Sequence, residues 1–133
     1  MSRSAIILFL SLVVHAASAQ DLSIKDVAAR PTHFNGKRVS VIGYFVAAHE
    51  ECCLYTSRKA ARRVPPTADL QAGHIFWIEF LGGANRMVLN NHYGRFTGVF
   101  RYRAIPKDPE GAGFGQWGLF SSQLEVTSYE PVR

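Results

Sequence analysis

The chain has 133 residues, of which 47% are hydrophobic and 19% charged, and its formal net charge is +5. This length fits one domain with its own apolar core, and the positive charge favours anionic partners only weakly because solubility alone also explains it. The two cysteines, Cys52 and Cys53, are neighbours, and Cα atoms about 3.8 Å apart are too close for an ordinary disulfide. These features exclude a disulfide-rich scaffold.

The first nineteen residues have the pattern of a cleavable secretory signal peptide. Arg3 gives the lead its positive charge, residues 5–14 are an apolar run, and Ala17 and Ala19 are the small residues before the cleavage site. A membrane span needs about 20 apolar residues, so this run is too short to remain as an anchor. We expect cleavage between Ala19 and Gln20, a mature domain of residues 20–133 without a transmembrane segment, and export to the periplasm or the medium.

A short helix is predicted next, because Ser23 and Asp26 have the spacing of a capping box. Pro31 ends this helix, and Asn35-Gly36 marks a turn. Five strands then follow from alternating or continuously apolar runs, over residues 39–48, 52–56, 74–81, 94–103 and 119–129. The polar connections 57–73 and 105–118 are long enough to be functional.

Two of these strands share a glycine-centred pattern. Val41-x-Gly43-x-Phe45 in the first strand matches Phe96-x-Gly98-x-Phe100 in the fourth. A glycine inside a strand usually marks a bulge or a sharp bend. This shared pattern therefore predicts two strands that bend in the same way around a small barrel.

Residues 36–43 carry the pattern G-K-x-V-x-V-x-G, which resembles the opening of OB-fold proteins. Together with the glycine-aromatic segment 113–120, it also resembles small, uncharacterised exported bacterial proteins of OB-fold-like type. The resemblance implies an all-β domain with one or two short helices, arranged as a five-stranded OB-fold-like Greek-key barrel. Such barrels bind ligands on their second and third strands and the adjoining loops.

Aromatic and basic side chains on this face are candidates for ligand binding, and they are Tyr44, Tyr55, Trp77, Arg101, Arg103 and Trp117. With Tyr102, Arg58 and Arg62 they also have the ingredients of a surface for single-stranded nucleic acid, where rings stack on bases and cations contact phosphates. The alternative is that the rings are core residues and that the arginines lie on a solvent-facing edge.

A second candidate site is the turn that contains His49, Cys52 and Cys53, since imidazole and thiolate ligands suit zinc or copper. Adjacent strand residues point to opposite faces, so the two thiols would not naturally share one metal. His33, His74 and His92 could supply further ligands. The alternative is one cysteine buried as a small apolar residue and the other near the surface.

Catalysis and nucleotide binding have little support. Burial could raise the pKa of Glu79 in its apolar strand, or Glu79 could pair with an arginine. Residues 111–115 spell G-x-G-x-G without the strand and helix of a dinucleotide site, so we interpret them as a mobile loop. The motifs of common hydrolases are absent from the sequence.

The sequence thus predicts an exported, non-enzymatic binding module without a cofactor, whose partner is a protein, a glycan or a small anionic ligand. A metal- or thiol-based role at His49, Cys52 and Cys53 is one alternative. Binding of single-stranded nucleic acid is the other.

Overall fold

The computed structural model describes residues 21–48, 51–63, 70, 73–82, 89–105, 111–115 and 118–133. The predicted signal peptide and the cleavage site at Ala19 and Gln20 lie outside these residues. Within the described ranges, no helix has the length and apolarity needed to cross a membrane.

The N-terminal elements are β1 (Asp21–Ser23), α1 (Ile24–Ala29) and α2 (Pro31–Phe34). The predicted capping box is confirmed: the backbone N–H of Asp26 donates to Ser23 Oγ at 3.0 Å, and the N–H of Ser23 donates to Asp26 Oδ2 at 2.9 Å. Pro31 ends α1, as predicted, and also begins α2, because proline is well suited to the first helical position. Neither β1 nor α2 was predicted.

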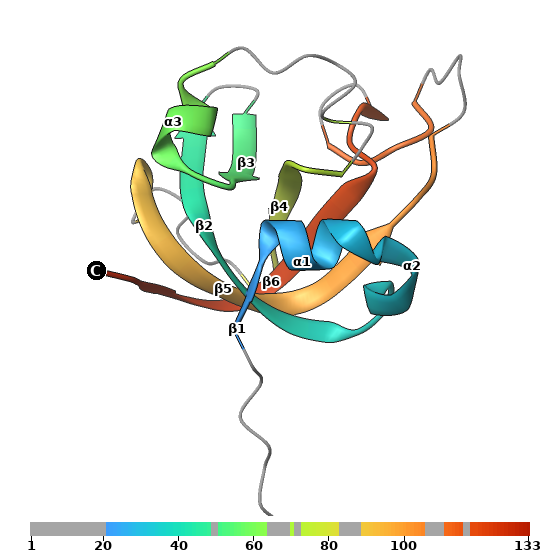
Figure 1. Ribbon diagram of the computed structural model, residues 1–133, viewed down its shortest axis with the longest axis horizontal. Coiled ribbons are helices and arrows are strands. Elements are labelled where there is room, and N and C mark those ends of the chain that lie inside the picture. Colours follow the sequence, from blue (N-terminus) through green and yellow to red (C-terminus); the bar gives the residue numbers. More distant parts are fainter. Residues whose placement is uncertain are drawn as a thin grey trace, which may run out of the picture.

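The remaining strands are β2 (Arg38–Ala48), β3 (Glu51–Tyr55), β4 (Phe76–Phe80), β5 (His92–Tyr102) and β6 (Ser122–Pro131). A third short helix, α3 (Arg58–Ala61), follows β3. The sheet order is β1-β2-β3-β4-β6-β5, and β2 also pairs with β5, which closes the sheet into a barrel (Figure 1). The predicted all-β, five-stranded OB-fold-like Greek-key barrel is confirmed, with β1 as one extra strand.

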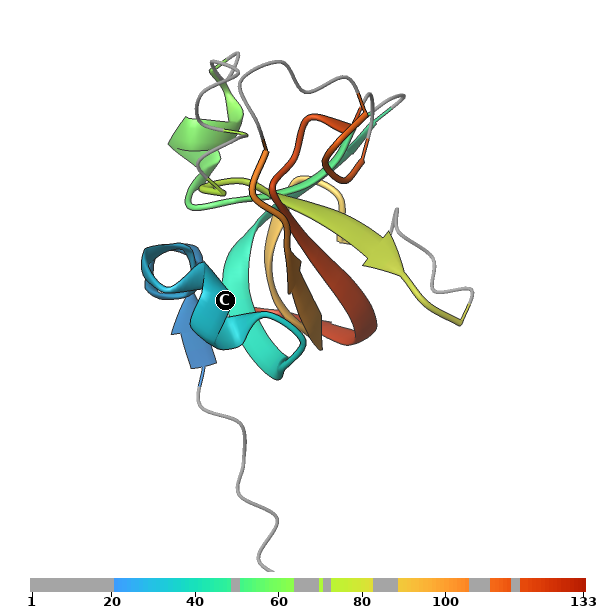
Figure 2. The same ribbon diagram turned by 90° about the vertical axis from the view of Figure 1, so that its right-hand side faces the viewer.

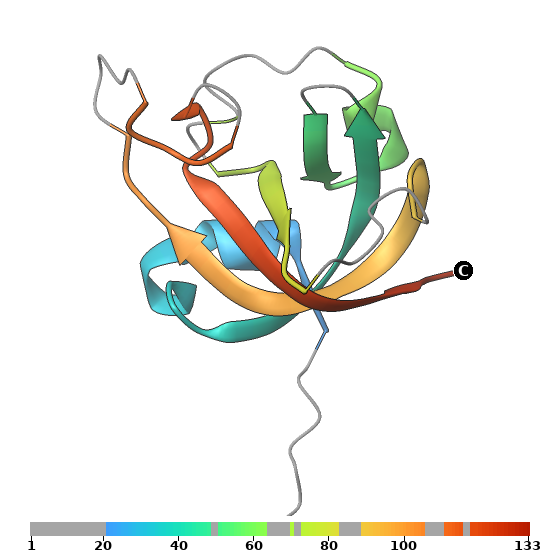
Figure 3. The same ribbon diagram turned by 180° about the vertical axis from the view of Figure 1, so that it is seen from behind.

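The position of β6 gives the barrel its Greek-key character. β6 lies between β4, to which it is parallel, and β5, to which it is antiparallel (Figure 3). β1 runs parallel to β2, whereas the other pairs are antiparallel. The sheet therefore closes only when the last strand has been inserted between two earlier ones.

Two glycines allow close approach of neighbouring strands. A Cβ atom on Gly43 would lie 2.7 Å from Leu54 Cγ, and one on Gly98 would overlap the backbone carbonyl of Glu125. Gly98 also lies at the register shift between β5 and β6. The glycine that marks an irregularity of the ladder is thus Gly98, while Gly43 leaves room for β3.

Apolar side chains form two separate clusters, because successive strand residues face opposite sides of the barrel wall. The main cluster fills the barrel and includes Phe45, Phe76, Phe96 and Phe100, all completely buried. Ile24 and Val27 of α1 and Phe34 of α2 extend this cluster. The second cluster lies outside the wall, and its buried members are Tyr44, Cys53, Tyr55, Leu70, Ile75 and Phe120.

Candidate functional site

The outer face of β3 and β4, where OB-fold barrels bind ligands, is the place where the second cluster forms. Cys53, Tyr55 and Trp77 come from these two strands. Segments that follow β3 or precede β6 cover them. We call these segments the covering layer, and its described members are residues 57–63, Leu70, residues 73–75, 111–115 and 118–120. Figure 2 shows α3 and the segment before β6 at the same end of the barrel.

The three predicted ring residues of this face are brought together, but beneath the covering layer. Tyr44 and Tyr55 are only 8% and 4% exposed. Trp77 is half-buried, with its ring centroid 5.3 Å from that of Phe120. The backbone of Gly115 lies on the indole, because a Cβ atom there would be 2.5 Å from the ring. Trp117, the fourth predicted ring, lies outside the described residues.

The two predicted arginines occupy different surroundings. Arg101 forms an ion pair with Glu125 on the neighbouring strand. Arg103 donates to the carbonyl oxygen of Ala112 at 3.2 Å and lies 5.2 Å above the ring centroid of Phe114. Arg103 therefore fastens the covering layer to the end of β5, whereas Arg101 has a partner on the barrel wall.

Cys52 and Cys53 face opposite sides of β3, as the alternation of a strand requires. Cys52 belongs to the main cluster and Cys53 to the second, and both are buried. Burial raises the pKa of the Cys53 thiol to about 12, so Cys53 is protonated at neutral pH and a poor nucleophile. The expectation that one cysteine would lie near the surface is wrong, because the covering layer buries the outward one.

Glu51 and Tyr55 are polar neighbours of Cys53. The Tyr55 hydroxyl donates to the Glu51 carboxylate, and burial, followed by this hydrogen bond, raises the pKa of Tyr55. His49 lies outside the described residues, and His33, His74 and His92 are exposed. Among the residues that the structure describes, no three His, Cys, Asp or Glu side chains are grouped as metal ligands.

One further sequence interpretation needs correction: Glu79 is exposed on β4, so the burial considered for it is absent. The described part of the glycine-rich segment folds back on itself: the N–H of Phe114 donates to the Phe120 carbonyl at 2.7 Å, and the N–H of Gly113 donates to the Gly118 carbonyl at 2.8 Å. This folding back places Phe114 against the second cluster.

The strongest feature that was not predicted from the sequence is the helix α3, which with its C-terminal extension presents a group of cations. Arg58, Lys59, Arg62 and Arg63 are all exposed, and none forms an ion pair with a described residue. The connection 57–73, which contains all four, is predicted to be functional, and Arg58 and Arg62 are also candidates for a nucleic-acid surface, but no helix is predicted there. The signal was present in the spacing, since residues at i, i+1, i+4 and i+5 share one side of a helix.

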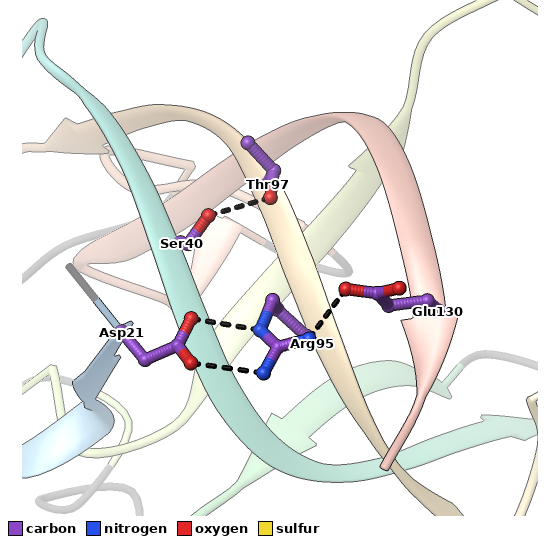
Figure 4. Close-up of polar contacts among 5 residues, drawn as sticks. All are labelled: Asp21, Ser40, Arg95, Thr97 and Glu130. Carbon is purple, nitrogen blue, oxygen red and sulfur yellow. Dashed lines mark hydrogen bonds and ion pairs between the residues drawn. The ribbon is translucent and has the colours of Figure 1, made fainter. Parts of the chain in front are cut away.

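Arg95 of β5 is the centre of a second polar region (Figure 4). Its guanidinium donates to both carboxylate oxygens of Asp21, at 2.7 and 2.9 Å, and to Glu130. Ser40 and Thr97 share a hydrogen bond beside it. A shallow depression is lined by Arg95, Thr97, Ser128, Tyr129 and Glu130. Because the cation is matched by two carboxylates, this region joins β1, β5 and β6 rather than offering a free charge.

No family model and no curated protein matches the chain. Among solved structures, it is similar to a crystal structure of a DUF3299 family protein from Pseudomonas aeruginosa PAO1, with a TM-score of 0.55 and 12% sequence identity. The match covers 87% of this chain and 97% of that one. At this identity the likeness shows the fold alone: the chain shares its barrel architecture with a protein whose family is named as a domain of unknown function.

Proposed function

We propose that the chain is an exported, non-enzymatic binding module of the OB-fold type, which recognises an anionic partner through the covering layer. The observation that carries this proposal is the group of four exposed cations on α3 and its C-terminal extension, none of which forms an ion pair with a described residue. These cations belong to the covering layer, which lies on the face where OB-fold barrels bind ligands. The rings of that face are occupied by the protein's own segments, so the outer surface of the covering layer is what a partner meets.

The placement of the reactive side chains supports a binding role over a catalytic one. The Cys53 thiol is buried with a raised pKa, and Glu79 is exposed without an ion pair to any described residue. A general acid or base normally lies in a cleft, within reach of a partner. Among the described residues none forms an ion pair with Glu79, and Cys53 is closed in by its own cluster.

Single-stranded nucleic acid is less well supported than other anions. Such a strand binds by stacking successive bases on exposed rings, and Tyr44, Tyr55 and Trp77 lie under the covering layer. The metal- or thiol-based alternative has no supporting observation among the described residues. An acidic glycan, an anionic protein surface or another anionic partner therefore fits better.

Retention on a column of immobilised heparin, which is a polyanion without lipid, tests the binding proposal. We expect the Arg58→Gln/Arg62→Gln double variant to elute at clearly lower salt than the wild-type protein. The matched control is Lys37→Gln/Arg38→Gln, which removes the same charge from exposed residues at the start of β2 and should elute much closer to wild type. Equal shifts for both variants would mean that net charge, and not α3, governs binding.

Export is tested separately. When the full chain is produced in a bacterial host, we expect the protein in the periplasmic or medium fraction with an intact mass that begins at Gln20. A full-length protein recovered in the cytosol would contradict the proposal.

A further inference from the structure

The four cations of α3 and its C-terminal extension are exposed as one group. Arg58, Lys59, Arg62 and Arg63 fall on one side of the turn, while Ala60 and Ala61 pack against the second cluster on the other. The apolar side of this turn is therefore already used within the protein. What remains outside is a group of four exposed cations, which we call the α3 patch.

The α3 patch is held in place before any partner arrives. Ser57 caps the helix, since its Oγ accepts from the N–H of Ala60 at 3.1 Å. The N–H of Arg58 donates to the hydroxyl of Tyr93 at 3.0 Å, and the Tyr93 ring contacts Tyr44 edge-on at 5.1 Å. Binding thus requires little ordering of the backbone, which lowers its entropic cost.

The position of the patch selects among anions. A small anion binds best in a concave site that surrounds it, whereas α3 lies at the edge of the barrel (Figure 1). A nucleic-acid strand needs several rings in succession, and Tyr93, 40% exposed, is the one exposed aromatic residue at α3 within the described chain. A broad, flat array of anionic groups requires neither a pocket nor a series of rings.

We propose that the α3 patch docks the protein on an anionic phospholipid surface, an inference that rests on the proposed function because it uses the same residues. Clustered Lys and Arg are attracted to such surfaces, each by a similar increment. Three of the four cations are arginines, whose planar guanidinium matches phosphate with two parallel hydrogen bonds. Tyr93 lies beside them, and tyrosine is a favoured residue at membrane–water interfaces.

Docking of this kind is reversible and depends on salt. An interfacial helix that inserts in lipid buries an apolar face, but Ala60 and Ala61 are packed inward. The attachment is therefore electrostatic, and it weakens as the Debye length shortens with added salt. Removal of one cation should lower the partition coefficient about fivefold.

Sedimentation with vesicles tests the inference on the mature protein. Wild type should sediment with vesicles that contain phosphatidylglycerol and not with pure phosphatidylcholine, and 0.5 M salt should release it. Arg58→Gln/Arg62→Gln should lower the partition coefficient about 25-fold, since two cations are lost. Lys37→Gln/Arg38→Gln should change it by less than about threefold, because these residues lie outside the patch.

The outcomes separate the two proposals. Retention on heparin without sedimentation on any vesicle would overturn membrane docking and leave the proposed function standing. A wild-type protein that neither binds heparin nor sediments with any vesicle would overturn both proposals. A wild-type protein that binds a fluorescent oligonucleotide while ignoring vesicles would assign the patch to nucleic acid instead. Equal losses in the two double variants would also overturn the inference. Unchanged circular dichroism and unfolding midpoints serve as the folding control for each variant.

Discussion

The barrel interior and the covering layer are both built from apolar side chains, but they are held by different means. Phe45, Phe76, Phe96 and Phe100 of the interior are completely buried and come from strands fixed by ladders. Leu70, Ile75 and Phe120 of the covering layer retain 6–8% exposure and come from connecting segments. A few contacts hold these segments, such as the 3.2 Å hydrogen bond from the N–H of Ser121 to the Leu70 carbonyl. Stability is therefore unevenly distributed, as in most proteins.

The largest effect is expected at the ladder itself. Gly98→Val should destabilise the protein by at least about 3 kcal/mol or prevent folding, because the added atoms would overlap the backbone carbonyl of Glu125, which cannot move aside like a side chain. Gly82→Ala is the control. No atom lies within 4 Å of its added Cβ, but φ is +77°, so we expect a loss of about 1 kcal/mol. Urea unfolding measures both, and similar losses would contradict this account of Gly98.

Paired phenylalanine truncations compare the two regions directly. Phe100→Ala should cost about 3–5 kcal/mol, because it leaves a cavity in the interior. Phe120→Ala should cost about half of that, since the covering layer can close over the gap. Urea unfolding of both variants provides the measurement. Equal losses would show that the covering layer is as firmly packed as the barrel.

The adjacent cysteines of β3 can be used to compare how readily the two regions open, because each lies in a different cluster. In single-cysteine variants made with Cys→Ala, Cys53 should be alkylated at least about tenfold faster than Cys52, because Cys53 is reached once the covering layer opens, whereas Cys52 requires opening of the barrel. Both rates should lie far below that of a small-molecule thiol. The rates are followed by mass spectrometry under native conditions at pH 8. Equal rates would mean that the two regions open together.

Arg103→Gln should loosen the covering layer without affecting the interior. It removes the contact with the Phe114 ring and weakens the hydrogen bond to Ala112, which together contribute about 1 kcal/mol. Hydrogen exchange of the Phe114 amide, bonded to Phe120, should accelerate about fivefold. The amide of Leu124 on β6 is the internal control, and faster exchange there would contradict a local role for Arg103.

The smallest effect concerns pH. The hydrogen bonds from Arg95 hold the pKa of Asp21 below its ordinary value of 3.8. A depressed pKa in the folded state gives stability that is fully present above the ordinary pKa and is lost as pH falls through the lowered one. Asp21→Asn should therefore lower the unfolding temperature slightly at pH 7 and not at pH 2. Equal losses for Asp21→Asn at both pH values would contradict this account of Asp21.

The elements with local signals could be predicted from the sequence, and those that depend on distant partners could not. The alternation of Phe96 and Phe100 with polar neighbours gave the face of β5, and Ser23 with Asp26 gave the start of α1. β1 has three residues and exists only because β2 accepts it in parallel. The last strand begins at Ser122, later than predicted, because Phe120 packs on Trp77 instead of joining the ladder to β5.

The candidate site was predicted less well for the same reason. Tyr44, Tyr55 and Trp77 do share one face, as the strand pattern indicated. Whether that face is open depends on Leu70, Ile75 and Phe120, which reach it from other parts of the chain. The α3 patch is the converse case, since its spacing was visible but its exposure, without an ion pair to any described residue, was not.

The location of β6 between β4 and β5 has a consequence for biosynthesis. β6 is made after the other strands of the barrel, and until it arrives β4 lacks its parallel neighbour and β5 lacks one whole side of its ladder. Earlier strands can at most form a partial sheet, so the barrel is completed only after β6 has been made. If the protein is exported as proposed, we expect this order to keep the chain unfolded during passage through a secretion channel and to delay folding until it has crossed the membrane.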